Sequence, residues 1–234
     1  MLVGAWEFER SYRDNSGASN HGTIAGNPLA WAIPQQGHGV QLSGNAYSHI
    51  IPGSRLFPLG SSPRTTIIRF RLRSNTDQAL FCYGSNGLGL RWNIGYCATQ
   101  QRLVFEGGSI ASGCAHAIDY KPHHLAVILP RDKSHASELL YVLDGRLVPT
   151  ITIADGILNT TAELPAFGVI KCAGIWASDA EIFSCYHFNE ALSVANVQRI
   201  MQRGLGSSFP RLAYQSQVDT FNPYYYNLLL RRAA

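Results

Sequence analysis

Short apolar runs separated by turn residues recur along most of the chain, and no other feature of the sequence constrains the fold more strongly. The clearest run is 65–73, where apolar and basic residues alternate from position 68 onward. Further runs of this kind occupy 88–93, 102–105, 124–129, 139–143, 150–153 and 182–188. Successive side chains of a β-strand point to opposite faces, so short alternating runs joined by Gly, Asn and Pro turns predict an all-β sandwich or barrel.

Two local signals refine this prediction. The pair Asp144-Gly145 follows one apolar run and precedes another, which is typical of a tight β-hairpin. Nearer the C-terminus, apolar residues recur with helical spacing over 194–201. Ser193 is the expected N-cap of this helix, and Gly204 is expected to end it. We therefore expect one short helix after the last strand.

Composition excludes several classes of protein. Of the 234 residues, 46% are hydrophobic and only 15% are charged, which is too apolar for a disordered chain. No apolar run approaches the roughly 20 residues needed to span a membrane, and a formal charge of +4 is too small to indicate nucleic-acid binding. No signal peptide is recognisable, because Glu7 follows the start without a basic stretch. We expect a soluble protein with one core and with neither nucleic acid nor a membrane as partner.

Six motifs add a resemblance to this reading. They are LVGAWEFE at 2–9, DNSGASNHGT at 14–23, GVQLSG at 39–44, HHLAV at 123–127, LLYVLDG at 139–145 and NEALS at 189–193. In this order and spacing they resemble the laminin-G-like, concanavalin A-like jelly-roll family. The resemblance implies a two-sheet antiparallel jelly-roll sandwich over residues 1–204 with one short C-terminal helix. It leaves residues 205–234 as a linker and an aromatic, extended tail.

The resemblance also bears on metal binding. Calcium-binding members commonly pair the N-terminal loop with an acid on the last strand, and the matching positions here are Phe183 and Ser184. That departure argues against a calcium site of the family type, so no cofactor is expected. Asp14 and Asn20 still offer oxygens that a hard cation such as calcium accepts. The alternative is that both side chains cap a tight loop through hydrogen bonds to nearby backbone groups.

Motifs of catalysis are missing from the chain. Glucanases of this fold carry two carboxylates on one strand face in an E-x-D-x-x-E run, and no such run occurs here. Neither a G-x-S-x-G elbow nor a P-loop nor an H-E-x-x-H helix is present. The neighbours His123 and His124 are expected on opposite strand faces, which favours a structural role for the pair. We expect a protein that is not an enzyme and has no catalytic residues.

Basic and aromatic residues supply the candidates for ligand binding. Arg69 and Arg71, with Arg73, share one face of a predicted strand at intervals of about 6.5–7 Å. Such a row suits an acidic or sulfated sugar, or an acidic protein surface. The alternative is a solubilising edge strand that resists edge pairing. Arg91 is a further candidate for an acidic group and Trp92 for a sugar face, although a strand tryptophan is more often a core residue.

Two features of the sequence concern assembly and cysteine chemistry. The tail presents aromatic and aliphatic side chains that water solvates poorly, so it is expected to dock on another structural protein or on a second copy of the chain. Its candidate docking residues are Phe221, Tyr224, Tyr225, Tyr226 and Leu229. The cysteines are Cys82, Cys97, Cys114, Cys172 and Cys185. Buried free thiols are the expectation, with a disulfide between Cys82 and Cys97 as the alternative.

The resemblance leads to a function outside catalysis. Stand-alone modules that resemble this family are familiar in phage and viral particles. We therefore expect a structural or adhesive virion protein, in a decoration, a fibre or a tail, that binds host-surface glycans. The alternative is a carbohydrate-binding module of a cellular or secreted system, and a glycoside hydrolase is less favoured because the paired carboxylates are missing.

Overall fold

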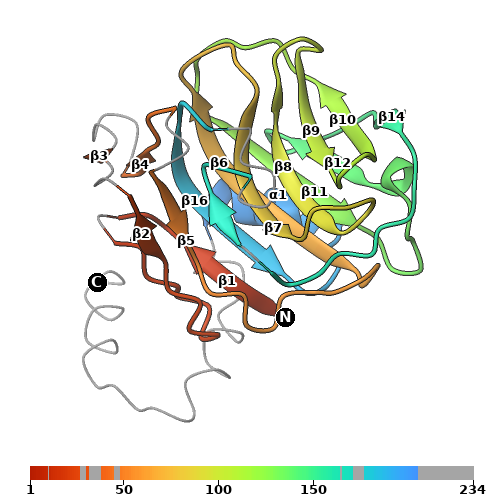
Figure 1. Cartoon of the computed structure of the whole chain (residues 1–234), viewed down its shortest axis with the longest axis horizontal. Coiled ribbons are helices and arrows are strands. Elements are labelled where there is room, and N and C mark those ends of the chain that lie inside the picture. The colour runs from red at the N-terminus through yellow and green to blue at the C-terminus, as the bar shows by residue number, and fades with distance from the viewer. Residues whose placement is uncertain are drawn as a thin grey trace.

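Two antiparallel sheets face each other in the computed structural model, which describes residues 1–9, 11–26, 30–31, 38–44, 48–163, 165–170 and 177–204 (Figure 1). Eight strands of the described residues form the first sheet, in the order β13 (Arg146–Val148), β12 (Leu140–Leu143), β11 (His123–Leu129), β6 (Arg64–Leu72), β16 (Ala180–Phe188), β4 (Val40–Gln41) and β3 (Ala30–Trp31), with β1 (Leu2–Trp6) paired to β16. The second sheet also has eight described strands, in the order β14 (Ile151–Ala154), β10 (Ala111–Ala115), β9 (Arg102–Glu106), β8 (Arg91–Cys97), β7 (Gln78–Gly84), β15 (Ala166–Phe167), β5 (His49–Ile51) and β2 (Thr23–Ala25). The predicted all-β sandwich is confirmed.

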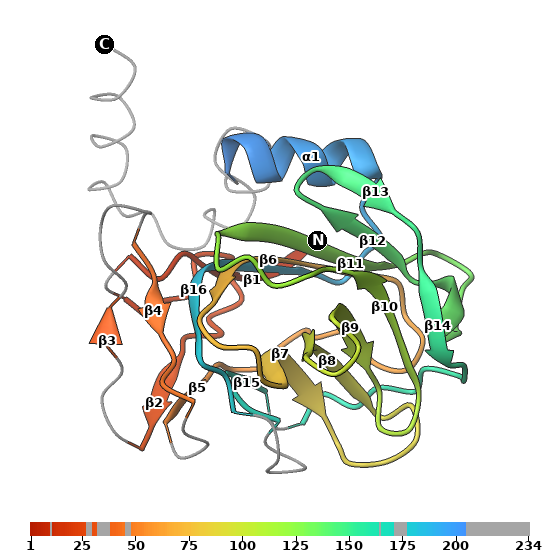
Figure 2. The same cartoon turned by 90° about the horizontal axis from the view of Figure 1, so that it is seen from above.

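The two sheets lie face to face, as Figure 2 shows, and the side chains of the main core come from strands of both sheets. Alternation decides which side chains enter it: Ile68, Phe70 and Leu72 of β6 are buried there. Aromatic side chains supply much of its volume, and the largest that are fully buried are Trp6, Trp92, Tyr83, Tyr96, Tyr141, Phe8, Phe70, Phe81, Phe105, Phe167 and Phe188. The first sheet packs on this core through one face only, because its other face meets a helix.

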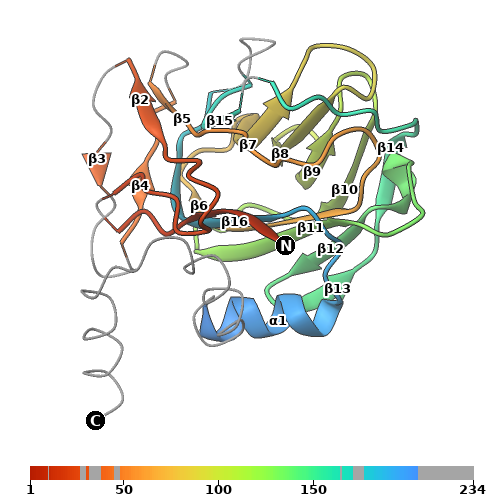
Figure 3. The same cartoon turned by 90° about the horizontal axis from the view of Figure 1, so that it is seen from below.

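Helix α1 (Val194–Arg203) lies on the outer face of the first sheet, as Figure 3 shows. Val197 and Ile200 are buried against outward side chains of the sheet, such as Ile67. Ser193 caps the helix by accepting the backbone N–H of Asn196, and Gly204 ends it with a φ of 70°. The predicted helix, its cap and its apolar face are therefore confirmed.

The hairpin prediction is confirmed, and two others need correction. Asp144 and Gly145 have φ of 48° and 78°, as a tight turn with two left-handed residues requires. The run 88–93 is a strand only from Arg91 onward, because residues 88–90 form a turn in which Gly89 has a φ of 72°. Strand β6 pairs with β11 on one side and β16 on the other, so the edge-strand reading of its arginines is wrong.

Cys97, Cys114 and Cys185 are free thiols. Burial raises the pKa of Cys114 to about 12, which keeps it protonated and inert at neutral pH. Because Cys97 is a free thiol, the alternative disulfide between Cys82 and Cys97 is wrong. Cys82 is buried in β7 opposite Asn93.

Some predictions concern residues outside those described. The docking residues Phe221, Tyr224, Tyr225, Tyr226 and Leu229, with the rest of 205–234, lie outside the described residues, as does Cys172. Within the described ranges, no helix is long and apolar enough to cross a membrane.

Candidate functional site

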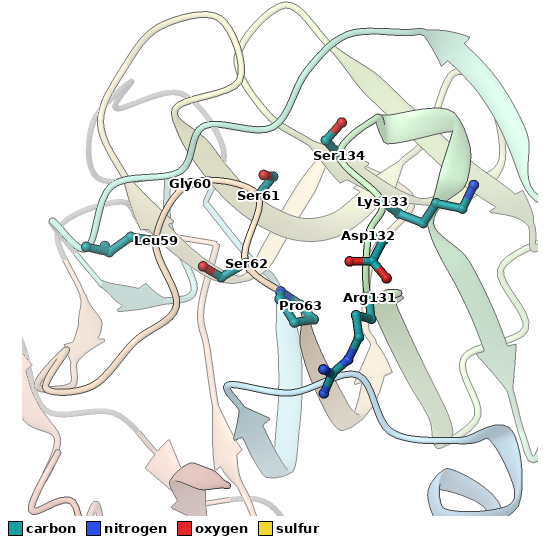
Figure 4. A pocket seen from close by; sticks show the side chains of 9 residues that line it. All are labelled: Leu59, Gly60, Ser61, Ser62, Pro63, Arg131, Asp132, Lys133 and Ser134. Atoms are coloured by element: carbon teal, nitrogen blue, oxygen red, sulfur yellow. The ribbon is translucent and has the colours of Figure 1, made fainter.

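An open groove lies at one end of the first sheet, where two loops leave neighbouring strands. Arg64 at the start of β6 pairs with Leu129 at the end of β11, so the loop before β6 and the loop after β11 emerge side by side. The groove has a volume of about 680 Å³ (Figure 4). Its lining residues are Leu59, Gly60, Ser61, Ser62, Pro63, Arg131, Asp132, Lys133 and Ser134.

The first wall of the groove is the loop 59–63, and Arg64 anchors it from below. The side chain of Arg64 is fully buried. Its Nη2 donates to the carbonyl oxygens of Gly60 at 2.6 Å and Leu59 at 3.3 Å, and its Nε donates to the carbonyl of Ser62 at 2.9 Å. Backbone hydrogen bonds between Gly60 and Thr160 fix the same loop to a neighbouring segment. The hydroxyls of this wall are thus presented by a backbone with little freedom to move.

The second wall of the groove is the loop 131–134. It is anchored by the carboxylate of Glu138, from the 3-10 helix η2 (Ala136–Glu138). Its Oε2 accepts the backbone N–H of Ser134 at 2.9 Å and of His135 at 3.0 Å, while Oε1 accepts from Lys133 Nζ at 2.8 Å. These three donors lower the pKa of Glu138 to about 2, with the lysine bond as the main cause. Asp132 occupies the left-handed region with a φ of 63°, which aspartate tolerates better than most residues.

The lining combines both kinds of hydrogen-bonding group with a small apolar surface. Figure 4 shows the carboxylate of Asp132 directed across the groove toward the opposite wall, whereas Lys133 points away from it. Within the described residues, no ion pair or hydrogen bond engages the side chains of Arg131 and Asp132. One anion, one cation and the hydroxyls of Ser61 and Ser62 are therefore available to a ligand that both donates and accepts hydrogen bonds.

Trp92 does not form a sugar platform, which corrects the prediction made for it. The side chain is fully buried, and its ring contacts that of Phe105 with 5.0 Å between centroids. Its Nε1 donates to the hydroxyl of Thr66 at 3.1 Å, and the guanidinium of Arg64 lies 5.1 Å from the ring centroid. Adjacent strand residues face opposite sides, and for Trp92 the inward side is the core.

Arg91 is buried as well, on the other face of β8, so the prediction of an accessible anion-binding arginine is wrong. It forms a two-pronged ion pair with Glu106, through Nε to Oε2 at 2.9 Å and Nη2 to Oε1 at 2.6 Å. The two side chains are only 6% and 14% exposed, so a ligand would have to break a desolvated pair to reach the guanidinium.

Arg69 and Arg71 of β6, with Arg73 just after the strand, share one face, as predicted, and that face is the outer side of the first sheet. Arg64, at the start of the same strand, points inward. Each guanidinium on the outer side has a partner within the chain. Arg69 lies over the ring of Phe183, 4.9 Å from its centroid, and Arg71 bonds the buried carboxylate of Glu181 at 2.5 Å. Arg73 and Asp179 form a further pair at 3.3 Å. The row is matched by acids and an aromatic ring, and none of it lines the groove.

Asp14 and Asn20 organise the N-terminal loop. The carboxylate of Asp14 accepts the backbone N–H groups of Ala5, Ser16 and Asn20, each at 2.8 Å, and the Ser16 hydroxyl at 2.7 Å. The amide oxygen of Asn20 accepts from the backbone N–H of Arg55 at 2.7 Å. Both side chains are almost fully buried. Their contacts are those of the loop-capping alternative, and the oxygens that calcium would need already serve N–H and O–H donors.

The two adjacent histidines of β11 face opposite ways, as predicted. His123 lies near Phe70 on the core side, with ring centroids 6.3 Å apart. His124 faces the outer side, where burial and the nearby Arg69 lower its pKa to about 4. His124 is therefore neutral at physiological pH, in line with a structural role.

No known family model matches the chain, and no curated protein matches its sequence. Many solved structures nevertheless share its fold. Domain 4 of AbnA, a GH43 extracellular arabinanase from Geobacillus stearothermophilus, solved in complex with arabinotriose, has a TM-score of 0.63 and 18% identity. The match covers 86% of this chain and 98% of that one.

Two neurotoxin structures are similar in the same way. The binding domain of botulinum neurotoxin DC in complex with SialylT has a TM-score of 0.62 and 13% identity, over 87% of this chain and 52% of that one. Another structure belongs to botulinum neurotoxin type C, whose cell entry is described as dependent on interaction with two ganglioside molecules. It has a TM-score of 0.62 and 14% identity, and the match covers 87% of this chain and 51% of that one. This chain thus spans about half the length of the neurotoxin chains. At such identities the likeness shows the fold alone, a two-sheet antiparallel β-sandwich.

Proposed function

We propose that the protein is a non-enzymatic glycan-binding module that holds its ligand in the groove between residues 59–63 and 131–134. The observation that carries the proposal is that Arg131 and Asp132 line the open groove beside two serine hydroxyls, and that no ion pair or hydrogen bond within the described residues engages their side chains. Each sugar hydroxyl can donate one hydrogen bond and accept two, so it suits a lining that holds an anion, a cation and hydroxyls. Leu59 and Pro63 add apolar surface for the C–H face of a sugar ring.

The structural neighbours support this reading at the level of the fold. One was solved with arabinotriose and one with SialylT, and the names of several describe binding domains. Fold likeness alone does not carry a ligand from one protein to another, so the groove residues bear the argument here. The neighbours favour a carbohydrate-binding module over a virion component. A virion location stays a prediction from the family resemblance, and no neighbour named above supports it.

The test is binding of the full chain to an array of neutral and sialylated oligosaccharides that includes arabinotriose, followed by titration calorimetry with the best binder. The groove variant combines Arg131→Gln with Asp132→Asn, which leaves the net charge unchanged and keeps a residue that tolerates the left-handed backbone. Charge-assisted hydrogen bonds contribute about 1.5–3 kcal/mol each, so affinity should fall at least tenfold.

A matched control combines Glu9→Gln with Arg146→Gln, which are exposed and lie outside the groove. It should bind as the wild type does. Equal binding by the groove variant, or the absence of any binder on the array, would overturn the proposal.

A further inference from the structure

A second group of polar side chains lies at the opposite end of the same strand pair. His116 follows β10, Asp119 lies in the next loop, and His123 opens β11 opposite Phe70. One nitrogen or oxygen of each of the three residues lies within 4.8 Å of the others. Six rungs of the β6–β11 ladder separate this group from the groove, which corresponds to about 20 Å.

His123 is held between two carboxylates. Its Nε2 lies 2.8 Å from Oδ1 of Asp119, and its Nδ1 lies 2.7 Å from Oδ2 of Asp144. Asp144 is itself fixed, because its Oδ1 accepts the backbone N–H of His124 at 2.8 Å in the tight hairpin turn. A carboxylate on Nδ1 orients the ring and directs Nε2 toward Asp119, which is the arrangement found around histidines that bind a metal ion.

His116 supplies a further nitrogen donor on the same side. The two imidazole rings meet edge to face with 4.6 Å between their centroids. Within the described residues no side-chain hydrogen bond occupies either nitrogen of His116, while its backbone N–H is fixed on Gln101 at 3.0 Å. Asp119 is exposed, and its loop is fixed by the backbone N–H of Lys121, which donates to Oδ1 at 3.0 Å. The donors are positioned by backbone; Asp119 is exposed, and His116 and His123 are half-buried.

We propose that His116, Asp119 and His123 bind a divalent transition-metal ion of the zinc class, with Asp144 orienting His123 from behind. Two imidazoles and one carboxylate suit Zn²⁺, Cu²⁺ or Ni²⁺, whereas Ca²⁺ and Mg²⁺ prefer oxygen ligands throughout. Small side-chain rotations would bring the three donor atoms to the distances of about 2.0–2.2 Å that Zn²⁺ requires. Three protein ligands leave a fourth position for water.

The competing reading is a purely structural ion pair, in which a protonated His123 bridges Asp119 and Asp144. The two readings differ in their need for His116, which contributes to a metal site but donates no hydrogen bond to either carboxylate. They differ also in their response to metal, because an imidazolium has no lone pair to offer. An experiment with metal alone therefore separates them.

The first experiment titrates ZnCl₂ into the full chain by calorimetry, with CaCl₂ as the comparison. One saturable zinc site is expected, with no binding of calcium at the same concentration. His116→Gln and Asp119→Asn should each weaken zinc binding by at least a hundredfold. His124→Gln is the matched control, since this neighbouring histidine faces the other side of the strand, and it should bind zinc as the wild type does.

The second experiment uses Co²⁺ as a probe, because the visible absorption of bound cobalt reports its coordination directly and does not depend on protein stability. The wild type and His124→Gln should show the same d–d bands, which His116→Gln should lose. Asp144→Asn should keep the bands and weaken metal binding about 10- to 100-fold, as loss of an orienting carboxylate does. Absence of saturable zinc binding, or zinc binding that survives the combined loss of His116 and Asp119, would overturn the proposal.

Discussion

The guanidinium of Arg64 donates through Nη1 to the hydroxyl oxygen of Tyr83 at 2.9 Å, although both side chains are fully buried. Burial raises the pKa of Tyr83 to about 12, so the phenol stays neutral. The other hydrogen bonds of Arg64 go to the carbonyls of the first groove wall, and Trp92 lies beneath its charge. A buried cation therefore connects the core to the candidate binding loop.

Replacing Arg64 should cost stability and affinity together. Arg64→Lys keeps the charge but cannot reach Tyr83, Gly60 and Ser62 at once, so buried acceptors lose their donors. We expect the free energy of unfolding to fall by about 2–4 kcal/mol in urea denaturation. The exposed replacement Arg131→Lys is the control and should change stability by less than about 0.5 kcal/mol. A stable Arg64→Lys protein would show that the loop is held by other contacts.

Asp14→Ala should destabilise the protein whether or not calcium is present. The substitution removes the acceptor of four hydrogen bonds in a buried loop, and we expect a loss of about 2–4 kcal/mol. Calcium at millimolar concentration should leave the melting temperature of the wild type unchanged. Thermal unfolding with CaCl₂ and with EDTA measures both effects. A calcium-dependent rise of several degrees that Asp14→Ala abolishes would restore the metal-binding alternative.

His187 should make the protein sensitive to acid. Burial, with a smaller contribution from nearby Arg64, holds its pKa well below the usual value of about 6.5. Below pH 6.5 His187 is protonated in the unfolded chain but stays neutral in the folded chain. The stability of the folded state is therefore fully present above pH 6.5 and is lost as the pH falls below it. His187→Met should reduce the slope of unfolding free energy between pH 6.5 and 5, measured by urea denaturation, while His124, whose pKa is also lowered, keeps part of that slope. The exposed His38→Gln is the control, and equal slopes in all three proteins would contradict this prediction.

The ion pair of Arg91 and Glu106 should appear in a double-mutant cycle. Arg91→Met alone leaves a poorly hydrated carboxylate without its main partner, whereas Arg91→Met with Glu106→Leu removes both charges. The single variant should therefore be less stable than the double variant, with a coupling energy of about 1–3 kcal/mol in urea denaturation. A loss of oligosaccharide binding without loss of stability would instead return Arg91 to the ligand-binding residues.

Alternation and turn chemistry predicted an all-β sandwich or barrel, and the motif resemblance favoured the two-sheet sandwich. Arg69 and Arg71 fall on one face of β6, and the apolar residues Ile68, Phe70 and Leu72 fall on the other, as period-two spacing requires. The hairpin at Asp144-Gly145 and the capped helix follow from local chemistry as well. Strands of two residues, such as β3 and β4, have no period to detect. The motif at 39–44 was the only signal for β4, and β3 had none.

The candidate site was beyond such reasoning. Ser62 and Asp132 lie far apart in the sequence, and they meet only because β6 pairs with β11 in one register. Their loops carry ordinary turn residues, so the only signal was that each borders a predicted strand. The sequence offered Arg91 and Trp92 as ligand-binding residues, because alternation does not show that contacts bury both of them. Exposure is a property of the assembled sandwich and not of a strand.

The ladder between β6 and β11 joins the groove to the histidine group through paired backbone that runs without a bulge from Arg64 opposite Leu129 to Phe70 opposite His123. A ladder of this kind shortens or bends very little, so it behaves as a spacer of fixed length. Occupancy at one end should then leave affinity at the other end unchanged, with a coupling free energy near zero. A molecule built in this way can hold two unlike ligands at a constant separation. A mutation that changes the affinity at one end should leave the affinity at the other end as it was.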